Sequence, residues 1–596
     1  MKYPKLYAQQ SSRDMVDVFK GYNHNLRIGE GEFYDMKNMT SDFYPVLAPT
    51  KPRGLYISPD APAGMIAKDA LCYVDGTDFV INGYHVDMGL STAEEDCPKQ
   101  LISMGAYVII MPDKKYINTA NLSDFGNIEA EFKTTDPVSF TLCRLDGSEY
   151  VVEYTQPTAP EEPANMALWI DTSSEPHALR QWSEVSGMWV GIATCYVKIS
   201  SPGIGASFEK YDGITISGLK DQVLYDADTE EEIAPEDIVA LDGAAVVWDK
   251  GDNYIVVVGM LDATRTIANE VIISRKMPNV DFIVESENRL WGCRYGVAVN
   301  GDIVNEVYAS KLGDFKNWNC YMGLSTDSYT ASVGTDGSFT GAITQPGVVL
   351  FFKENCIHKV YGNFPANFQI QTTMCRGVQR GCERSLAMVN EVVFYKAKHA
   401  VCAYDGSLPT EISGALGDVA YKNAVAGSHG NKYYISMEDM SGKYHFFVYD
   451  TAKGMWHKED DLRADCFCSC REELYCIEHN SKKIITILGS GEKLKDKVDW
   501  MVETGPISMN MPDMKYLTRL LLRMSVEMGG SFRISLQYDS FGAWEMQFAG
   551  RCTNTRSFSM PIRPRRCDHF RLRIEGTGDA RIYSITKTIE QGSDIP

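Results

Sequence analysis

The sequence predicts an all-β protein: a β-propeller of about seven blades with an inserted β-rich region and a C-terminal β-sandwich. Three observations lead to this fold class. Aromatic residues make up 11% of the 596-residue chain, and such side chains fit pleated, half-buried sheets. The 49 glycines suit many tight turns. Apolar hairpin-like units recur, the later ones spaced at roughly 40–50 residues, which is the period of a propeller blade.

Residues 1–60 form a predicted N-terminal arm. Glycines and prolines punctuate this segment, and hydrophobic residues lie between polar ones. This mix favours an arm that lies along another surface, and packing on its own domain is the alternative. Tyr44 and Pro45 are candidate contact residues of the arm.

Two parts of the chain carry the predicted blades, residues 61–127 and 281–495. In the first part, Ala70–Val74 and Phe79–Tyr84 flank Asp75-Gly76, a strong hairpin signal. About five similar hairpins follow in the second part. One hairpin cannot bury both of its faces, whereas blades stacked around an axis can. A series of independent sandwiches is the alternative architecture.

The remaining regions also have strand character. Residues 128–280 combine prolines and acidic runs with short apolar segments, which indicates one or two β domains inserted between the second and third blades. Residues 496–596 contain clean period-two alternation, as in Phe532–Tyr538 and His569–Ile574. Alternation of this kind is typical of sheets with one buried face, and a C-terminal sandwich fits it.

Composition and charge exclude several function classes. The net charge of −21 disfavours a general nucleic-acid-binding role, because an acidic surface repels phosphates. The N-terminus lacks the apolar core of a signal peptide, and no window resembles a membrane span, so no stable membrane insertion is expected. Many of the 16 cysteines lie within apolar strand-like runs, which predicts buried free thiols made in a reducing cytoplasm.

No catalytic, cofactor-binding or metal-binding residue can be identified from the sequence, so we do not expect an enzyme or a cofactor. The usual hydrolase, metalloprotease, phosphate-loop and dinucleotide motifs are missing from the sequence. Cys466, Cys468 and Cys470 alternate along one predicted strand, which is a poor tetrahedral zinc set. The simpler interpretation is that these cysteines act as small apolar residues that face a crowded layer between blades.

Two groups of arginines are candidate interaction residues. Arg376 and Arg380 lie in one loop and would contact a neighbouring subunit, with a solvated loop as the alternative. Arg563, Arg565 and Arg566 form the main basic concentration of an acidic chain. They would meet an acidic patch on a partner. The alternatives are a solvated strand face and contact with DNA passing through a channel.

Several motifs resemble those of phage tail nozzle proteins, also called phage stabilisation proteins. The segments that carry the resemblance are Asn38–Thr40, Tyr44–Pro49, Pro52–Gly54, Asn288–Gly292, Tyr308–Lys311, Asn317-Trp318, Val349–Asn355, Tyr404–Gly406 and Ile412-Ser413. Pro561–Cys567 and Glu590–Asp594 look like the ends of other phage structural proteins. Residues 128–280 have no counterpart in this resemblance.

The resemblance implies a homo-oligomeric ring, often of six subunits, in the tail of a bacteriophage virion. Such a ring sits below the adaptor and portal and forms part of the DNA ejection conduit, so DNA passes transiently. Assembly would take place in the host bacterial cytoplasm. The resemblance carries over no catalytic residue.

Two other functions stay open from the sequence. A receptor- or glycan-binding tail module would use exposed tryptophans, for which Trp182, Trp189, Trp291 and Trp318 are candidates. A glycoside hydrolase or lyase would need two carboxylates that converge in a cleft.

Overall fold

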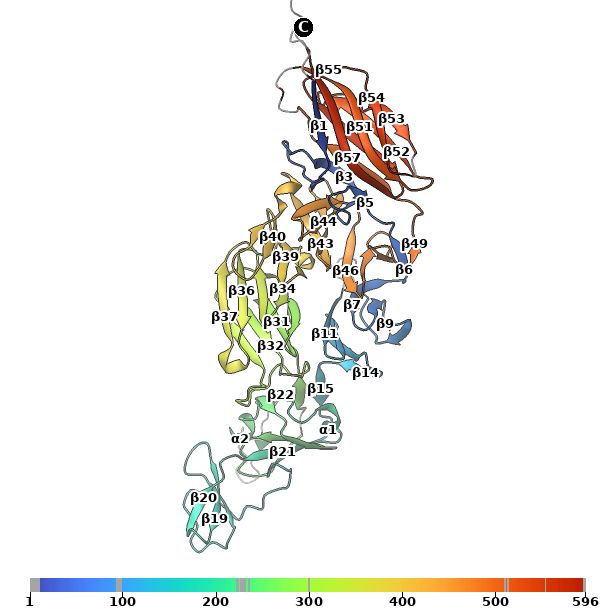
Figure 1. The fold of residues 1–596 in the computed structure, drawn as a ribbon. Helices are drawn as coiled ribbons and strands as arrows, with labels where there is room; N and C mark the ends of the chain where they lie inside the picture. Colours follow the sequence, from blue (N-terminus) through green and yellow to red (C-terminus); the bar gives the residue numbers. More distant parts are fainter. Residues whose placement is uncertain are drawn as a thin grey trace, which may run out of the picture.

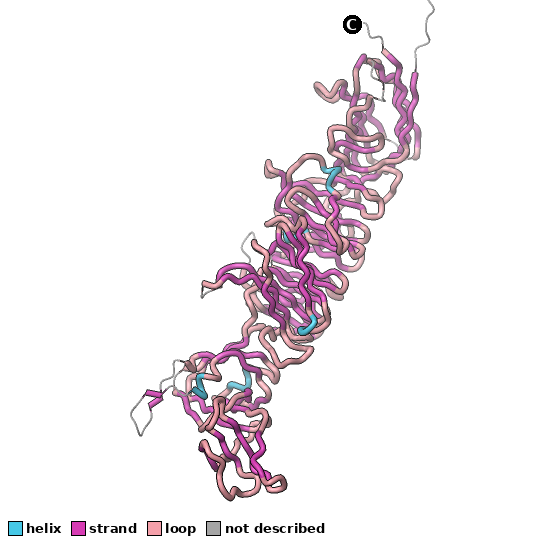
Figure 2. Tube along the Cα trace, turned by 90° about the vertical axis from the view of Figure 1, so that its left-hand side faces the viewer, coloured by secondary structure: helices cyan, strands magenta, loops and turns pink. Residues whose placement is uncertain are grey.

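The protein is an elongated, almost entirely β-stranded molecule (Figure 1). The computed structural model describes residues 11–92, 99–220, 224–225, 232–233, 236–268, 270–298, 301–508, 511, 514–551 and 554–592. The inserted region lies at one end, the C-terminal sandwich at the other, and the propeller between them (Figures 1 and 2). In the described part of the chain, no helix is long and apolar enough to cross a membrane.

Seven antiparallel sheets of the described residues form the blades of the propeller. The first two blades are β7 (Pro62–Ala67), β8 (Leu71–Asp75), β9 (Asp78–Ile81) and β10 (Tyr84–Asp87), then β11 (Gln100–Met104), β12 (Tyr107–Met111), β13 (Lys115–Asn118) and β14 (Asn121–Asn127). The third and fourth are β30 (Phe282–Ser286), β31 (Arg289–Val297), β32 (Ile303–Ala309) and β33 (Tyr329–Ser332), then β34 (Phe339–Gln345), β35 (Val348–Lys353), β36 (Cys356–Tyr361) and β37 (Gln369–Met374).

Three further blades complete the ring. Their strands are β38 (Ala387–Val389), β39 (Val392–Lys396), β40 (Val401–Tyr404) and β41 (Thr410–Glu411), then β42 (Tyr421–His429), β43 (Lys432–Asp439), β44 (Tyr444–Asp450) and β45 (Met455–Lys458), then β46 (Ala464–Cys470), β47 (Glu473–Glu478), β48 (Ile484–Thr486) and β6 (Gly54–Ile57). Short 3₁₀ helices η1 (Pro365–Asn367), η2 (Glu383–Ser385) and η3 (Ser413–Leu416) lie in the connections.

The ring closes on itself. The first strands of neighbouring blades contact one another in the order β7, β11, β30 and β34, and then β38, β42, β46 and back to β7. Between the fourth and fifth blades, η2 makes the contact with β34. Strand β6 comes from the N-terminal segment and pairs with β48, so residues far apart in the sequence complete the seventh blade. Apolar clusters fill the spaces between blades, as where Met65 and Tyr73 of the first blade meet Ile477 of the seventh. The predicted propeller is confirmed.

The inserted region contains two sheets around a shared core of buried Val, Ile, Leu and Phe side chains, and a smaller distal sheet. The first sheet is β15 (Ala130–Lys133), β29 (Ile272–Arg275), β22 (Gly213–Ser217) and β25 (Gly243–Val246). The second is β26 (Asp249–Gly251), β27 (Tyr254–Val258), β21 (Tyr196–Ser200), β16 (Val138–Cys143) and β28 (Arg265–Ile267). The distal sheet is β17 (Tyr154–Gln156), β18 (Leu168–Asp171), β19 (Ala178–Ser183) and β20 (Met188–Gly191), and α1 (Ile204–Ser207), α2 (Glu236–Val239), β23 (Leu224–Tyr225) and β24 (Glu232–Ile233) complete the region.

A buried polar network anchors the inserted region to the third blade. Asn317 donates from Nδ2 to Asp212 Oδ1 at 2.9 Å, and its Oδ1 accepts from the Gly213 backbone at 2.8 Å. Arg275 pairs with the same Asp212 carboxylate. Because all these side chains are buried, replacing Asp212 would remove a buried acceptor from both Asn317 and Arg275.

The C-terminal sandwich packs two sheets face to face. One sheet has the order β1 (Ser11–Val16), β57 (Ala580–Gln591), β51 (Lys515–Val526) and β54 (Arg556–Pro561), with β55 (Arg566–Cys567) also on β51. The other contains β50 (Asp499–Thr504), β56 (Phe570–Thr577), β52 (Ser531–Tyr538) and β53 (Glu545–Gly550). Alternate residues of β51 such as Leu520 and Leu522 are fully buried and belong to the same core as Ile534 and Ile574 of the facing sheet. The predicted sandwich is confirmed.

The N-terminal segment ties the propeller to the sandwich. Strands β2 (Gly21–Tyr22) and β3 (Glu32–Lys37) lie between β45 of the sixth blade and β50 of the sandwich. The result is one continuous sheet of ten strands that runs from β42 to β53. The short pair β4 (Met39–Thr40) and β5 (Ala48–Pro49) follows. The expectation that this arm lies along another surface is therefore wrong for residues 11–60, which pack on their own chain.

Candidate interaction sites

The candidate contact residues Tyr44 and Pro45 lie in the turn between β4 and β5, at the junction of propeller and sandwich. Ser41 donates from Oγ to Asp450 Oδ2 of the sixth blade at 2.6 Å. On the other side, the guanidinium of Arg581 lies 3.6 Å from the ring centroid of Phe43. The turn is therefore held from both sides, and Tyr44 itself is 42% exposed.

Arg376 and Arg380 lie in the connection between the fourth and fifth blades. Arg376 pairs with Glu411 of β41 at 2.9 Å, and Arg380 donates to Ser338 Oγ at 2.7 Å. Both arginines therefore have partners within the chain. The Arg376–Glu411 pair is largely exposed, and such a pair contributes little to stability.

Arg563 and Arg565 lie between β54 and β55 of the sandwich, and Arg566 begins β55. Arg565 pairs with Glu545 at 2.6 Å and lies over the ring of Tyr538. The structure thus distributes the predicted contact residues over three places: the junction turn, the propeller rim and the sandwich. It does not bring them together in one site.

Two of the tryptophans considered for stacking on sugars are part of the core. Trp291 is 4% exposed and Trp318 is 2% exposed, and the indole of Trp318 donates to the Phe315 carbonyl. The interpretation of these two as exposed stacking platforms is wrong, because the propeller uses them as packing between elements. Trp182 and Trp189, in contrast, pair across β19 and β20 in the distal sheet and are partly exposed.

The alternating cysteines of β46 line the interface between the seventh and first blades. Cys466, Cys468 and Cys470 belong to the apolar cluster that contains Tyr73 and Val80 of the first blade. Burial raises the pKa of the Cys468 thiol, as expected for a group removed from water. Within the described residues, no group of three or more His, Cys, Asp or Glu is arranged to hold a metal ion.

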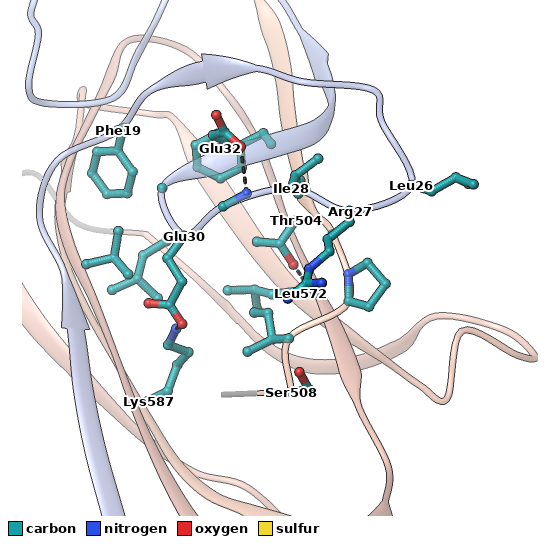
Figure 3. A pocket seen from close by; sticks show the side chains of 18 residues that line it. Phe19, Leu26, Arg27, Ile28, Glu30, Glu32, Thr504, Ser508, Leu572 and Lys587 are labelled. Carbon is teal, nitrogen blue, oxygen red and sulfur yellow. Dashed lines mark hydrogen bonds and ion pairs between the residues drawn. The ribbon is translucent and has the colours of Figure 1, made fainter. Parts of the chain in front are cut away.

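A cavity of about 730 Å³ lies where the N-terminal segment crosses the sandwich (Figure 3). Lys587 is 3% exposed in its side chain and pairs with Asp14 at 3.1 Å and Glu30 at 3.0 Å. Phe19 and Leu572 form part of the apolar wall. Sequence reasoning missed this site. The available signal was a lysine at an alternate, inward position of β57, between Ile585 and Ile589.

A second cavity of about 420 Å³ lies between the sixth and seventh blades and the N-terminal segment. Three buried titratable side chains are among the residues that line it: Asp450, His457 and Glu459. Burial lowers the pKa of His457 to about 3, with Lys432 adding to the effect, so the imidazole is neutral. Burial raises the pKa of Glu459 to about 7, against the opposing effect of Arg53, which contacts it at 3.1 Å.

Glu459 is expected to contribute a fall in stability between about pH 5 and pH 8, which the buried His457 opposes below about pH 6.5 because its pKa is lowered. The pKa of Glu459 is about 7 in the folded chain against an ordinary 4.5, so the protonated side chain favours folding at low pH and this contribution is lost as pH rises. The shift corresponds to about 3 kcal/mol. In urea titrations at several pH values, Glu459→Gln should reduce the dependence of the unfolding free energy on pH in this range. Glu492→Gln, at an exposed position, is the control and should keep the slope.

Comparisons with known proteins leave the family open. No family model and no curated protein matches the chain. Among solved structures, the chain is similar to an exo-β-1,3-galactanase from Phanerochaete chrysosporium, with a TM-score of 0.21 and 9% identity over 51% of this chain and 94% of that one. It is also similar to PorZ of the type-IX secretion system of Porphyromonas gingivalis, with a TM-score of 0.25 and 11% identity over 89% and 77% of the two chains. Likenesses this weak support no argument about activity.

Proposed function

We propose that the chain is a structural component of a bacteriophage tail, a nozzle or hub protein. It works by assembling with copies of itself, with the portal and adaptor and with other tail proteins. This places it in the virion tail and gives it no catalytic role. Three of the motifs that resemble nozzle proteins, Asn288–Gly292, Val349–Asn355 and Tyr404–Gly406, fall on strands and turns of three consecutive blades, as the resemblance requires.

The observation that carries the proposal is the ten-stranded sheet that crosses from propeller to sandwich. Backbone hydrogen bonds continue through β45, β2, β3 and β50, so the two bodies share one sheet. A large permanent assembly needs protomers of fixed shape, because an interface of several thousand Å² cannot form between parts that reorient. A long body whose propeller and sandwich are joined by one continuous sheet suits the wall of a conduit.

Exposed apolar side chains give this body surfaces that a partner would cover. At the tip of the inserted region, Val185 is fully exposed and Met188 is 58% exposed. At the β31–β32 end of the third blade, Val297 is 66% and Ile303 77% exposed. Apolar groups gathered at projecting ends are typical of contact surfaces.

Co-expression with portal and adaptor, followed by size exclusion with light scattering and electron microscopy, tests the proposal. A ring of this chain on the portal–adaptor complex is expected. A chain that stays monomeric alone and fails to join that complex would overturn the proposal. Val297→Asp with Ile303→Asp should weaken ring formation if this hairpin lies in the interface. Tyr84→Asp, on the outermost strand of the first blade, is a control for the added charge.

A glycan-binding tail module is the second candidate, and the distal aromatic cluster favours it. The indole rings of Trp182 and Trp189 lie 5.5 Å apart between centroids, and Trp169 packs 5.3 Å from Trp189. Partly exposed indoles of this kind can stack on the apolar faces of sugar rings. Binding on a glycan array that Trp182→Ala abolishes would support this function. Arrays with no signal at all would exclude it.

A further inference from the structure

The cavity between the sixth blade, the seventh blade and the N-terminal segment has the features of a ligand site. Its lining comes from three separate parts of the fold, namely residues 39–42 with Thr50 and Lys51, the strand ends of the sixth blade, and Ile487 and Leu488 of the seventh. Its volume of about 420 Å³ is within the range of small-molecule sites, roughly 300–1,000 Å³. Tyr44 and Pro45 of the intervening turn are not among the lining residues.

A buried imidazole without a partner lines this cavity. His457 is 4% exposed, and its Nδ1 atom has no hydrogen-bond partner among the described residues. A buried polar atom left unsatisfied is costly, so native proteins usually supply a partner from the chain, from water or from a ligand. A neutral imidazole offers one N–H and one lone pair, and can therefore both donate to and accept from a hydroxyl group.

The charges around the cavity cancel one another. The lining contains three lysines and three acidic residues, Lys51, Lys432, Lys453, Asp42, Asp450 and Glu459. Lys432 pairs with Asp42 at 2.5 Å, Lys453 pairs with Asp450 at 3.0 Å, and Glu459 is held by Arg53. An ion would have to compete with these three pairs, whereas a neutral ligand leaves them in place. The remaining charged side chain of the lining, Lys51, is exposed to solvent.

Apolar side chains complete the lining. Val448 and Tyr434 are buried beside the polar groups, and Met39, Ile487 and Leu488 also border the space. Thr40 and Ser41 contribute hydroxyl groups near the lysine and aspartate side chains. A site with neutral donor–acceptor groups beside apolar walls matches a sugar ring, which has hydroxyl groups at its rim and C–H groups on its faces.

We propose that this cavity binds a neutral, hydroxyl-rich small molecule of the size of one or two sugar units, with His457 hydrogen-bonded to a ligand hydroxyl. The proposal is independent of assembly into a tail, because every lining residue belongs to one chain.

Nuclear magnetic resonance on the full chain labelled with ¹⁵N-histidine tests this proposal. Galactose, glucose and N-acetylglucosamine are the neutral probes, and inorganic phosphate is the charged probe. At least one sugar is expected to shift the ring resonances of His457 in a saturable way, with those of His479 unchanged. His479 is the internal control because it pairs with Asp465, outside the cavity lining. A response to phosphate alone, or to none of the probes, would overturn the proposal.

Two variants test the site by different routes. His457→Leu removes the ring nitrogens and should weaken sugar binding about tenfold or more, the size of one lost hydrogen bond to a buried group. If this variant does not fold, Leu488→Trp fills the cavity without replacing any residue of the polar cluster and should block binding. His479→Gln is the matched control and should bind as the wild type does. Unchanged sugar affinity in Leu488→Trp would contradict the assignment of the site.

Discussion

Gly54→Ala is expected to open the propeller ring and to lower the free energy of unfolding by about 4 kcal/mol. A Cβ atom at this position would lie 1.8 Å from the Ser490 carbonyl oxygen and 2.5 Å from Thr486 Oγ1. Gly54 belongs to β6, which pairs with both β48 and β49 (Glu492–Lys493). The clash is with backbone, so the closing strand has to move away.

Urea denaturation and limited proteolysis measure this effect. The variant should unfold at lower urea concentration and be cut earlier between the first and seventh blades. Gly334→Ala is the control, because a Cβ there meets nothing within 4 Å. Equal stability of Gly54→Ala and the wild type would show that β6 does not close the ring.

Gly21→Ala is expected to loosen the sandwich from the propeller, with a loss of about 3 kcal/mol. Gly21 has a φ of +86°, and a Cβ would lie 2.4 Å from the Trp456 carbonyl oxygen. Its strand β2 carries the pairing between β45 and β3. Separating β2 from β45 would break the ten-stranded sheet at its narrowest point.

Differential scanning calorimetry distinguishes this effect from general destabilisation. The wild type should unfold with the propeller and sandwich coupled, and the variant should show the two transitions moving apart. Gly313→Ala is the matched control. Its φ is +74° but an added Cβ meets nothing within 4 Å, so this variant has the backbone strain of a positive φ without a steric clash. If both variants behave alike, the contact with Trp456 does not matter.

Local patterns were sufficient to predict the fold class. Each blade is a run of adjacent strands, and turns such as Asp75-Gly76 mark its hairpins within a few residues. The sandwich strands alternate cleanly because one face is buried, as along β52 and β56. Such signals depend on neighbours in the sequence, which is why they are readable without a structure.

The role of the N-terminal segment could not be predicted in this way. Strands β2, β4 and β5 have two residues each, too short for any periodicity. Their partners are distant: Tyr22 pairs with Trp456, and Gly54 pairs with Thr486. The mixed polar and apolar character of the segment reflects this packing on two bodies, and the same character suits an arm that lies on another protein.

The candidate sites were harder to predict than the fold. The preceding residues do not reveal which tryptophan is buried: polar Asn317 precedes buried Trp318, whereas apolar Met188 precedes the partly exposed Trp189. His457 and Glu459 alternate with Trp456 and Lys458 at the end of one strand, and their burial depends on Arg53 and residues 39–51 from the far end of the chain. A sequence pattern does not reveal pKa shifts that depend on tertiary contacts.

Immunogold electron microscopy of phage particles is the most direct test of the proposed function. An antibody to this chain would be applied to purified virions from the source of the sequence. The tail proposal expects label at the head–tail junction or tail tip, in copies set by the tail symmetry. Virions without label, with the protein soluble in the lysate, would contradict the structural role and favour a free binding protein or enzyme.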